Sequence, residues 1–325
     1  MSDPVLAIHG GAGAVSRAAL TPDAARDYEE NLRRIATSAY AALAGGVGAV
    51  EAVTLAVAML EDCPLFNAGR GAVYTSKATH EMDAAIMDGR TLAAGAVTCV
   101  HGVKNPVRAA RAVMERSNHV LLAGEGGMEF LRGLGVAFEP EEYFHSEQRY
   151  AQLLAARAKD PLRMVLDHDG TAWPAQSHAP AAHPDDKGRM GTVGAVARDR
   201  SNALAAATST GGLTNKLPGR VGDTPLIGAG CYADAVAAVS CTGVGEYFIR
   251  LCVGHDIAAR MRYQGASLAE AGRAVLDNLT ALGGSGGFIA VDKEGNLILP
   301  FNTESMYRAW IGTDGACQTA IHGEG

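Results

Sequence analysis

What the chain lacks excludes several classes of protein. No uninterrupted apolar run approaches the roughly 20 residues that a membrane-spanning helix needs. The first residues have neither the basic region nor the apolar region of a signal peptide. The six cysteines are scattered, with no Cys-x-x-Cys pair and no His–Cys spacing typical of zinc sites. We therefore expect a cytoplasmic protein without a membrane partner, whose cysteines are reduced and buried.

The charge balance argues against a nucleic-acid partner. The 325 residues contain 28 Lys and Arg against 35 Asp and Glu, which gives a net charge of −7, and they include no long basic stretch. Charged residues make up 19% and hydrophobic residues 48%, so the chain can bury a sizeable core and is not disordered. The 40 glycines exceed the ordinary share of about 7% and predict many tight turns.

Hydrophobic periodicity and turn residues predict helices and strands along the whole chain. Thr21 and Pro22 mark the start of a helix that Gly45 and Gly46 end near Ala44. The first half also predicts a strand over 5–9 ended by glycines, helices over 50–60, 106–115 and 127–134, a loop over 67–71, and a strand over 84–87. The second half predicts hairpins of 192–197 with 203–208 and of 288–292 with 297–300, a strand over 236–241, and helices over 246–263 and 267–279. This order fits helices packed on stacked sheets.

A polar linker precedes a threonine that could act as a nucleophile. Residues 158–191 are punctuated by Pro and His and show no clear periodicity, and Gly191-Thr192 then leads into a strand. If the peptide bond between Gly191 and Thr192 breaks, Thr192 becomes N-terminal. Its α-amine, with an ordinary pKa of about 8, could then take the proton of its own hydroxyl, which is one way to activate a weak nucleophile.

Two glycine motifs have simpler interpretations than the sites they suggest. Gly11-Ala12-Gly13 follows a strand as a dinucleotide-binding turn does, but Ser16 replaces the third glycine and no helix is predicted at once. Residues 283–287 contain a Gly-x-Ser-x-Gly pattern, but a strand is predicted after them, where a nucleophile elbow needs a helix. We interpret both as glycine turns.

Arg220 and Asp223 lie three residues apart in a glycine-flanked turn and suggest a receptor for an α-amino acid. A guanidinium can bind a carboxylate through two parallel hydrogen bonds, and a nearby carboxylate can bind an ammonium. The ordinary alternative is a surface ion pair worth less than ~1 kcal/mol. After a predicted strand, Thr242-Gly243 offers a hydroxyl and backbone amides suited to an oxyanion hole. The alternative there is a simple strand-to-helix turn.

Taken together, these motifs resemble the isoaspartyl peptidase/L-asparaginase family of N-terminal nucleophile (Ntn) hydrolases, often called plant-type asparaginases. The resemblance spans almost the whole chain and rests on long motifs in a fixed order. The matching motifs are residues 9–13, 67–69, 191–196, 208–212, 215–223, 228–233 and 300–303. The chain departs from the family pattern between Tyr232 and Cys241, where it is shorter.

The resemblance implies an α+β fold, a four-layer αββα sandwich, made as an inactive precursor in a single domain of residues 1–325. Cleavage between Gly191 and Thr192 would give an α chain of residues 1–191, ending in a mobile linker over 158–191, and a β chain of residues 192–325. The mature enzyme would hydrolyse L-asparagine to aspartate and ammonia, and would also hydrolyse β-aspartyl (isoaspartyl) dipeptides.

The resemblance also implies residue roles. The implied catalytic residues are Thr192, Thr210, Thr242 and Gly243, and the implied substrate-binding residues are Asn67, Arg220, Val221, Gly222, Asp223 and Gly245. Arg220 would bind the substrate α-carboxylate and Asp223 its α-ammonium. Thr210 would tune the nucleophile, and Thr242 with Gly243 would stabilise the oxyanion.

No cofactor is required by the resemblance, but it implies a structural sodium ion bound by backbone carbonyls of the loop from Leu60 to Gly71. It also implies an (αβ)₂ assembly. Two alternatives remain open. One is a glycosylasparaginase-type hydrolase, against which the missing signal peptide and the unpaired cysteines count. The other is a homologue that binds an amino acid but never cleaves itself.

Overall fold

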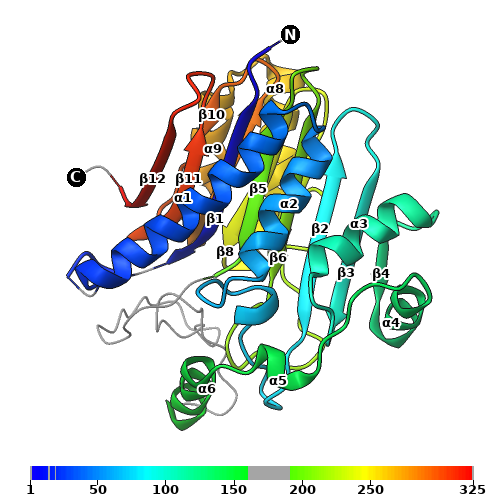
Figure 1. Ribbon diagram of the computed structural model, residues 1–325. Helices are drawn as coiled ribbons and strands as arrows, with labels where there is room; N and C mark the ends of the chain where they lie inside the picture. Colours follow the sequence, from blue (N-terminus) through cyan, green and yellow to red (C-terminus); the bar gives the residue numbers. More distant parts are fainter. Residues whose placement is uncertain (1, 14, 19, 160–190, 324–325) are drawn as a thin grey trace.

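The computed structural model describes residues 2–13, 15–18, 20–159 and 191–323, which form two β-sheets covered by helices (Figure 1). Among these residues, the larger sheet has eight strands in the order β12-β11-β1-β5-β6-β2-β3-β4, and the smaller sheet has four in the order β10-β9-β8-β7. β3 and β4 are parallel, and the other neighbours are antiparallel. The strands are β1 (Val5–Gly13), β2 (Met82–Asp88), β3 (Ala94–Val100), β4 (Leu121–Ala123), β5 (Val193–Arg198), β6 (Leu204–Thr210), β7 (Cys231–Ala233), β8 (Ala237–Gly243), β9 (Gly286–Asp292), β10 (Leu297–Ile298), β11 (Ser305–Ile311) and β12 (Cys317–His322).

Helices cover both sheets. α1, α2 and α3 pack on one face of the larger sheet, and the smaller sheet packs on its other face (Figure 1). α8 and α9 cover the remaining face of the smaller sheet. The helices are α1 (Pro22–Ala44), α2 (Ala49–Glu61), the 3₁₀ turn η1 (Gly69–Gly71), α3 (Pro106–Arg116), α4 (Gly124–Gly133), α5 (Glu141–Phe144), α6 (Glu147–Lys159), α7 (Gly245–Leu251), α8 (Val253–Gln264) and α9 (Leu268–Ala281).

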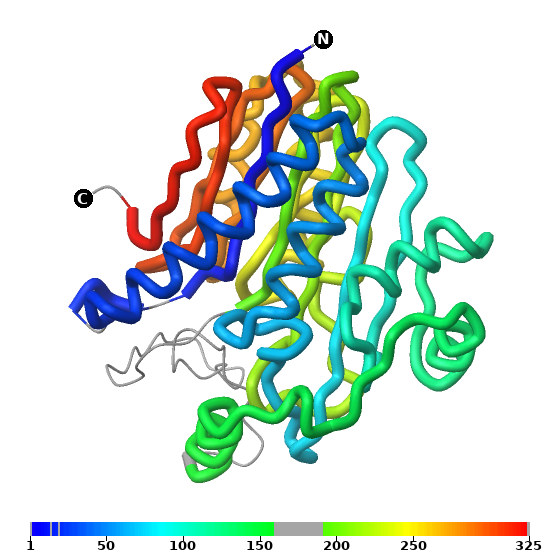
Figure 2. The backbone as a smooth tube through the Cα atoms, viewed as in Figure 1, coloured from blue at the N-terminus to red at the C-terminus, as the bar shows by residue number. Residues whose placement is uncertain are grey.

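The centre of the larger sheet is buried on both faces, as the composition of β5 shows. Val193 and Ala195 pack toward the helices, whereas Val196 packs toward the smaller sheet. Because neither face of the strand meets water, its residues 193–197 are all apolar instead of alternating with polar residues, and Arg198 ends it. β1 lies between β11 and β5, so the two ends of the sequence meet in one sheet (Figure 2).

Several local predictions are confirmed. Thr21 caps α1, because its Oγ1 accepts a hydrogen bond from Ala24 N at 3.2 Å. α2 and α9 form where expected, and β5 with β6 and β9 with β10 form the two expected hairpins. The structure also contains strands and helices that the sequence analysis did not predict. These are β3, β4, β7, β11, β12, α5 and α6.

The expected single helix over 246–263 is wrong. The chain turns at Cys252, whose φ of 48° lies in the left-handed region, and forms α7 and α8 instead. Two backbone amides in the first turn of α8 donate to carbonyls outside the helix. Gly254 N donates to Ala229 O at 3.2 Å, and His255 N donates to Gly228 O at 2.8 Å. These tertiary hydrogen bonds break a segment that contains no proline.

The expected end of the first strand at His9 is also wrong, because β1 continues to Gly13. The pairing with β11 shifts between His9 and Gly11, where Gly11 has a φ of 114° that a side chain would strain. The glycines therefore provide a bulge within the strand. The predicted linker over 158–191 lies mostly outside the described residues, and within the described ranges no helix is both long and apolar enough to cross a membrane.

Candidate active site

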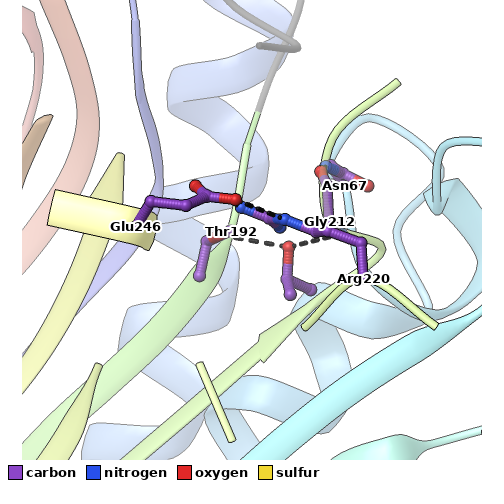
Figure 3. Close-up of polar contacts among 6 residues, drawn as sticks. Asn67, Thr192, Gly212, Arg220 and Glu246 are labelled. Carbon is purple, nitrogen blue, oxygen red and sulfur yellow. Dashed lines mark hydrogen bonds and ion pairs between the residues drawn. The ribbon is translucent and has the colours of Figure 1, made fainter. Parts of the chain in front are cut away.

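Thr192 lies at the head of β5, in the middle of the larger sheet. Its side chain is largely buried, and its Oγ1 donates a hydrogen bond to Thr210 Oγ1 at 3.1 Å (Figure 3). Thr210 ends the neighbouring antiparallel strand β6 and accepts a second hydrogen bond from Gly212 N at 2.9 Å. The strand pairing therefore brings together two hydroxyl groups that are 18 residues apart in sequence.

Asn67 connects the loop after α2 to this pair of threonines. Its side chain is fully buried; Nδ2 donates to Gly212 O at 2.8 Å, and Oδ1 accepts from Val73 N at 3.0 Å. Gly212 is thus held through its N–H by Thr210 and through its carbonyl by Asn67 (Figure 3). Asn67 positions the backbone beside the nucleophile, and the described residues that line the cavity do not include it.

Thr242 and Gly243 end β8 on the opposite side of Thr192. Thr242 Oγ1 accepts a hydrogen bond from Ala12 N at 3.1 Å, so the hydroxyl proton remains available for another acceptor. Gly243 has a φ of 149°, and an added Cβ would lie 2.4 Å from Ser285 O. Only glycine fits this turn, which places a hydroxyl and a backbone N–H at one edge of the cavity.

Asp223 is buried beside the same cavity, and burial raises its pKa to about 7, against the opposing effect of the Arg220 guanidinium. Among the described residues, no hydrogen-bond donor reaches its Oδ2. Gly245 makes room for this carboxylate, since a Cβ there would lie 2.7 Å from Asp223 Oδ1. A buried acceptor without a donor is suited to a cationic ligand.

Arg220 is held by Glu246, a residue that the sequence did not single out. Nε of Arg220 donates to Glu246 Oε1 at 2.9 Å and Nη2 donates to Oε2 at 2.8 Å (Figure 3). The two residues are 26 positions apart, so no local spacing pattern could have indicated the pair.

The predicted residues surround a small cavity of about 10 Å³, close to the space of one water molecule. Among the described residues, its lining includes Gly191, Thr192, Thr210, Arg220, Gly222, Asp223, Thr242 and Gly243. Val221 and Gly245 lie outside this lining; Gly245 acts through Asp223, and nothing in the structure gives the Val221 side chain a contact with the cavity. Gly191 is itself part of the wall of this small cavity.

Sequence reasoning also missed a buried polar chain behind Thr192. His9 Nε2 lies 2.9 Å from Ser240 Oγ, which in turn lies 2.7 Å from Thr208 Oγ1. Burial lowers the pKa of His9 to about 3, with a smaller opposing effect from the Thr192 backbone, so the ring is neutral at physiological pH. An added Cβ on Gly194 would lie 1.9 Å from Ser240 Oγ, so the glycine after Val193 allows this chain to form.

Comparison with known proteins now identifies the family. Residues 2–321 match the family model described as Asparaginase, and the chain belongs to this family. It is 56% identical to the isoaspartyl peptidase of Salmonella typhimurium (strain LT2) over 312 residues, which cover 95% of this chain and 96% of the relative. The isoaspartyl peptidase of Escherichia coli (strain K12) is also 56% identical, with 95% and 93% covered. The plant-type L-asparaginase of Pyrococcus abyssi is 40% identical, with 94% and 95% covered. The resemblance predicted from the motifs is therefore confirmed.

Proposed function

We propose that this chain is a self-cleaving amidohydrolase that hydrolyses L-asparagine to aspartate and ammonia and also hydrolyses β-aspartyl dipeptides. The observation that carries the proposal is the contact between the Thr192 and Thr210 hydroxyls beside Arg220 and the buried Asp223. The relatives named isoaspartyl peptidase, which match nearly the full chain, support the same activity.

Self-cleavage begins with attack by Thr192 Oγ1 on the carbonyl carbon of Gly191. The C–N bond breaks, the hydroxyl proton goes to the departing amine, and an ester joins the two residues. Water then hydrolyses the ester, giving fragments 1–191 and 192–325 of one domain. The new Thr192 amine supplies the general base, and removal of the Gly191 side of the cavity provides space for a substrate.

In the mature enzyme the Thr192 amine takes the proton from Oγ1 as this oxygen attacks the side-chain carbonyl of the substrate. The Thr242 hydroxyl and the Gly243 N–H stabilise the oxyanion. Collapse of the intermediate releases ammonia or an amine, which leaves with the proton. Water then hydrolyses the acyl-enzyme to aspartate. Thr210, whose Oγ1 lies 3.1 Å from the nucleophilic oxygen, keeps that oxygen in place.

The clamp for the aspartyl half consists of Arg220 and Asp223. The guanidinium binds the α-carboxylate, and the unpartnered Asp223 Oδ2 accepts from the α-ammonium. Gly222 and Gly245 let these groups approach closely. Because both charged groups of the amino acid are fixed, variation is tolerated only in the leaving group.

The wider arrangement supports further parts of the proposal. Helices on the outer faces of two packed sheets are the arrangement expected of the αββα sandwich of Ntn hydrolases. In the loop from Leu60 to Gly71, an added Cβ on Gly71 would lie 2.1 Å from Phe66 O and 2.8 Å from Pro64 O. Such convergent backbone oxygens suit a hard cation, so we include a structural sodium ion in the proposal. The proposal also includes an (αβ)₂ assembly and a cytoplasmic location.

The test is Thr192→Ala. We expect the wild-type protein to yield two fragments by intact mass and to hydrolyse both substrates, whereas the variant stays a single chain and loses activity by about a thousandfold or more. Thr91→Ala, in a surface turn after β2, serves as the matched control and should cleave normally. Two fragments from Thr192→Ala, or a preference of the wild-type for a glycosylated asparagine, would contradict the proposal.

A further inference from the structure

Arg220 already has a carboxylate partner within the protein. Glu246, the second residue of α7, contacts Nε and Nη2 of the guanidinium through both of its carboxylate oxygens (Figure 3). The side chains are only 11% exposed for Arg220 and 28% exposed for Glu246. A two-point contact between charged groups away from bulk water is strong and fixes the plane of the guanidinium.

The edge of the guanidinium that Glu246 leaves free faces the rest of the site. Among the described residues, no hydrogen bond is formed by Arg220 Nη1. An added Cβ on Gly222 would lie 2.9 Å from this atom, so Nη1 lies against the residue that precedes Asp223. Arg220 and Asp223, whose Oδ2 has no donor among the described residues, both line the cavity, so they are placed to bind the carboxylate and the ammonium of one amino acid.

We propose that Glu246 is a positioning and specificity-determining residue. It holds one edge of Arg220 so that the other edge takes a single substrate α-carboxylate, and its fixed negative charge weakens the binding of ligands that carry a second carboxylate. This inference rests on the proposed function. The ligand most affected is the product, L-aspartate, which differs from L-asparagine by an additional negative charge beside Thr192.

The two roles of Glu246 predict different changes. Loss of the orientation of Arg220 weakens every ligand that uses its α-carboxylate, whether substrate or product. Loss of the negative charge makes the pocket more positive, which favours aspartate, with a net charge of −1, over neutral asparagine. A role in orientation alone changes both affinities by one factor, whereas a charge role changes their ratio.

The experiment compares Glu246→Gln with wild-type protein after cleavage has been verified by intact mass. We expect KM for L-asparagine to rise about tenfold, while kcat stays within about threefold of wild type. The reason is that Arg220, which Glu246 orients, binds the α-carboxylate equally in the substrate and in the transition state. The inhibition constant for L-aspartate should rise much less, so that its ratio to KM falls about threefold or more. Glu125→Gln, which breaks an exposed pair with Arg132, is the matched control and should change neither value.

Glu246→Asp distinguishes the role of the Glu246 charge from the role of its side-chain geometry. It also tests the proposal if the Glu246→Gln protein does not cleave itself. This variant keeps the charge on a shorter side chain, so KM should rise while the ratio of the inhibition constant to KM stays within about twofold of wild type. An unchanged KM in both variants would overturn the positioning role. Equal rises of KM and the inhibition constant in Glu246→Gln, or a fall of the ratio in Glu246→Asp, would overturn the charge role. A wild-type protein that hydrolyses neither substrate would instead refute the proposed function.

Discussion

At the scale of single residues, we expect the charge state of Asp223 to control whether the site can hold an α-ammonium. Burial raises its pKa to about 7, the nearby Arg220 lowers it, and Glu246 raises it slightly again. A carboxyl group with a raised pKa is neutral at pH values below that pKa and charged above it. Only the charged form attracts the ammonium, so the fraction of competent enzyme falls as the pH falls through 7.

We therefore predict that kcat/KM for L-asparagine decreases below about pH 7 and approaches a tenfold loss per pH unit. The part of this loss that Asp223 causes should lie in KM, because Asp223 is expected to bind the substrate without reacting with it. Protonation of the Thr192 amine, the proposed general base, lowers kcat instead. The measurement is a pH profile between 5.5 and 8.5 on the cleaved enzyme, chosen from the pKa values of Asp223 and of an α-amine. Asp223→Asn should lower activity and remove this part of the profile. A KM that does not vary with pH would contradict the prediction.

At the scale of elements, the contact between β5 and β8 depends on one glycine. Gly194 lies in β5 where the smaller sheet approaches, and an added Cβ would lie 1.9 Å from Ser240 Oγ and 2.4 Å from His9 Nε2. Neither atom belongs to a flexible side-chain end, because both take part in the buried polar chain that includes Thr208. A side chain at Gly194 must therefore push the two strands apart or break that chain.

Gly194→Ala is expected to lower the free energy of unfolding by roughly 2–4 kcal/mol, through overpacking and the loss of buried hydrogen bonds. It should also slow cleavage, since Thr192 lies only two residues before Gly194. Denaturant unfolding and intact mass measure the two effects. The matched control is Gly126→Ala in α4, where no atom lies within 4 Å of the added Cβ and where the better helix former should be neutral or stabilising. Equal stabilities of the two variants would contradict this prediction.

At the scale of the whole molecule, the two fragments expected from cleavage share one sheet and one core. β1 from the first fragment lies between β5 and β11 from the second, and α1 and α2 pack on strands of both. Separation of the fragments would expose strand edges and the apolar faces of these helices to water.

We predict that cleavage leaves the fragments associated. They should elute together in size-exclusion chromatography under native conditions and separate only in denaturant, where a gel shows two bands. The uncleaved Thr192→Ala variant provides the size reference for one intact protomer. Fragments that elute separately without denaturant would show that the shared sheet does not hold them together.

The sequence by itself determined two kinds of feature. One is local structure that depends on neighbouring residues, and the other is the family, which long motifs indicate. The Thr21 cap, the two hairpins and the glycine before Thr192 depend on neighbouring residues. The family follows from motifs spread over residues 9–303, and the family match over residues 2–321 confirms it. Local patterns could not predict β11 and β12, whose pairing joins the end of the chain to β1, nor the helix break at Cys252, which tertiary hydrogen bonds produce.

Only the tertiary structure decided which side chains act on one another. Glu246 meets Arg220 across 26 residues and His9 meets Ser240 across 231. Such contacts depend on how strands align and helices end, and spacing along the chain does not encode them. The sequence thus indicated the candidate nucleophile and the candidate charged clamp, and the fold decided the partners that hold them, because a hydrogen bond depends on distance in space.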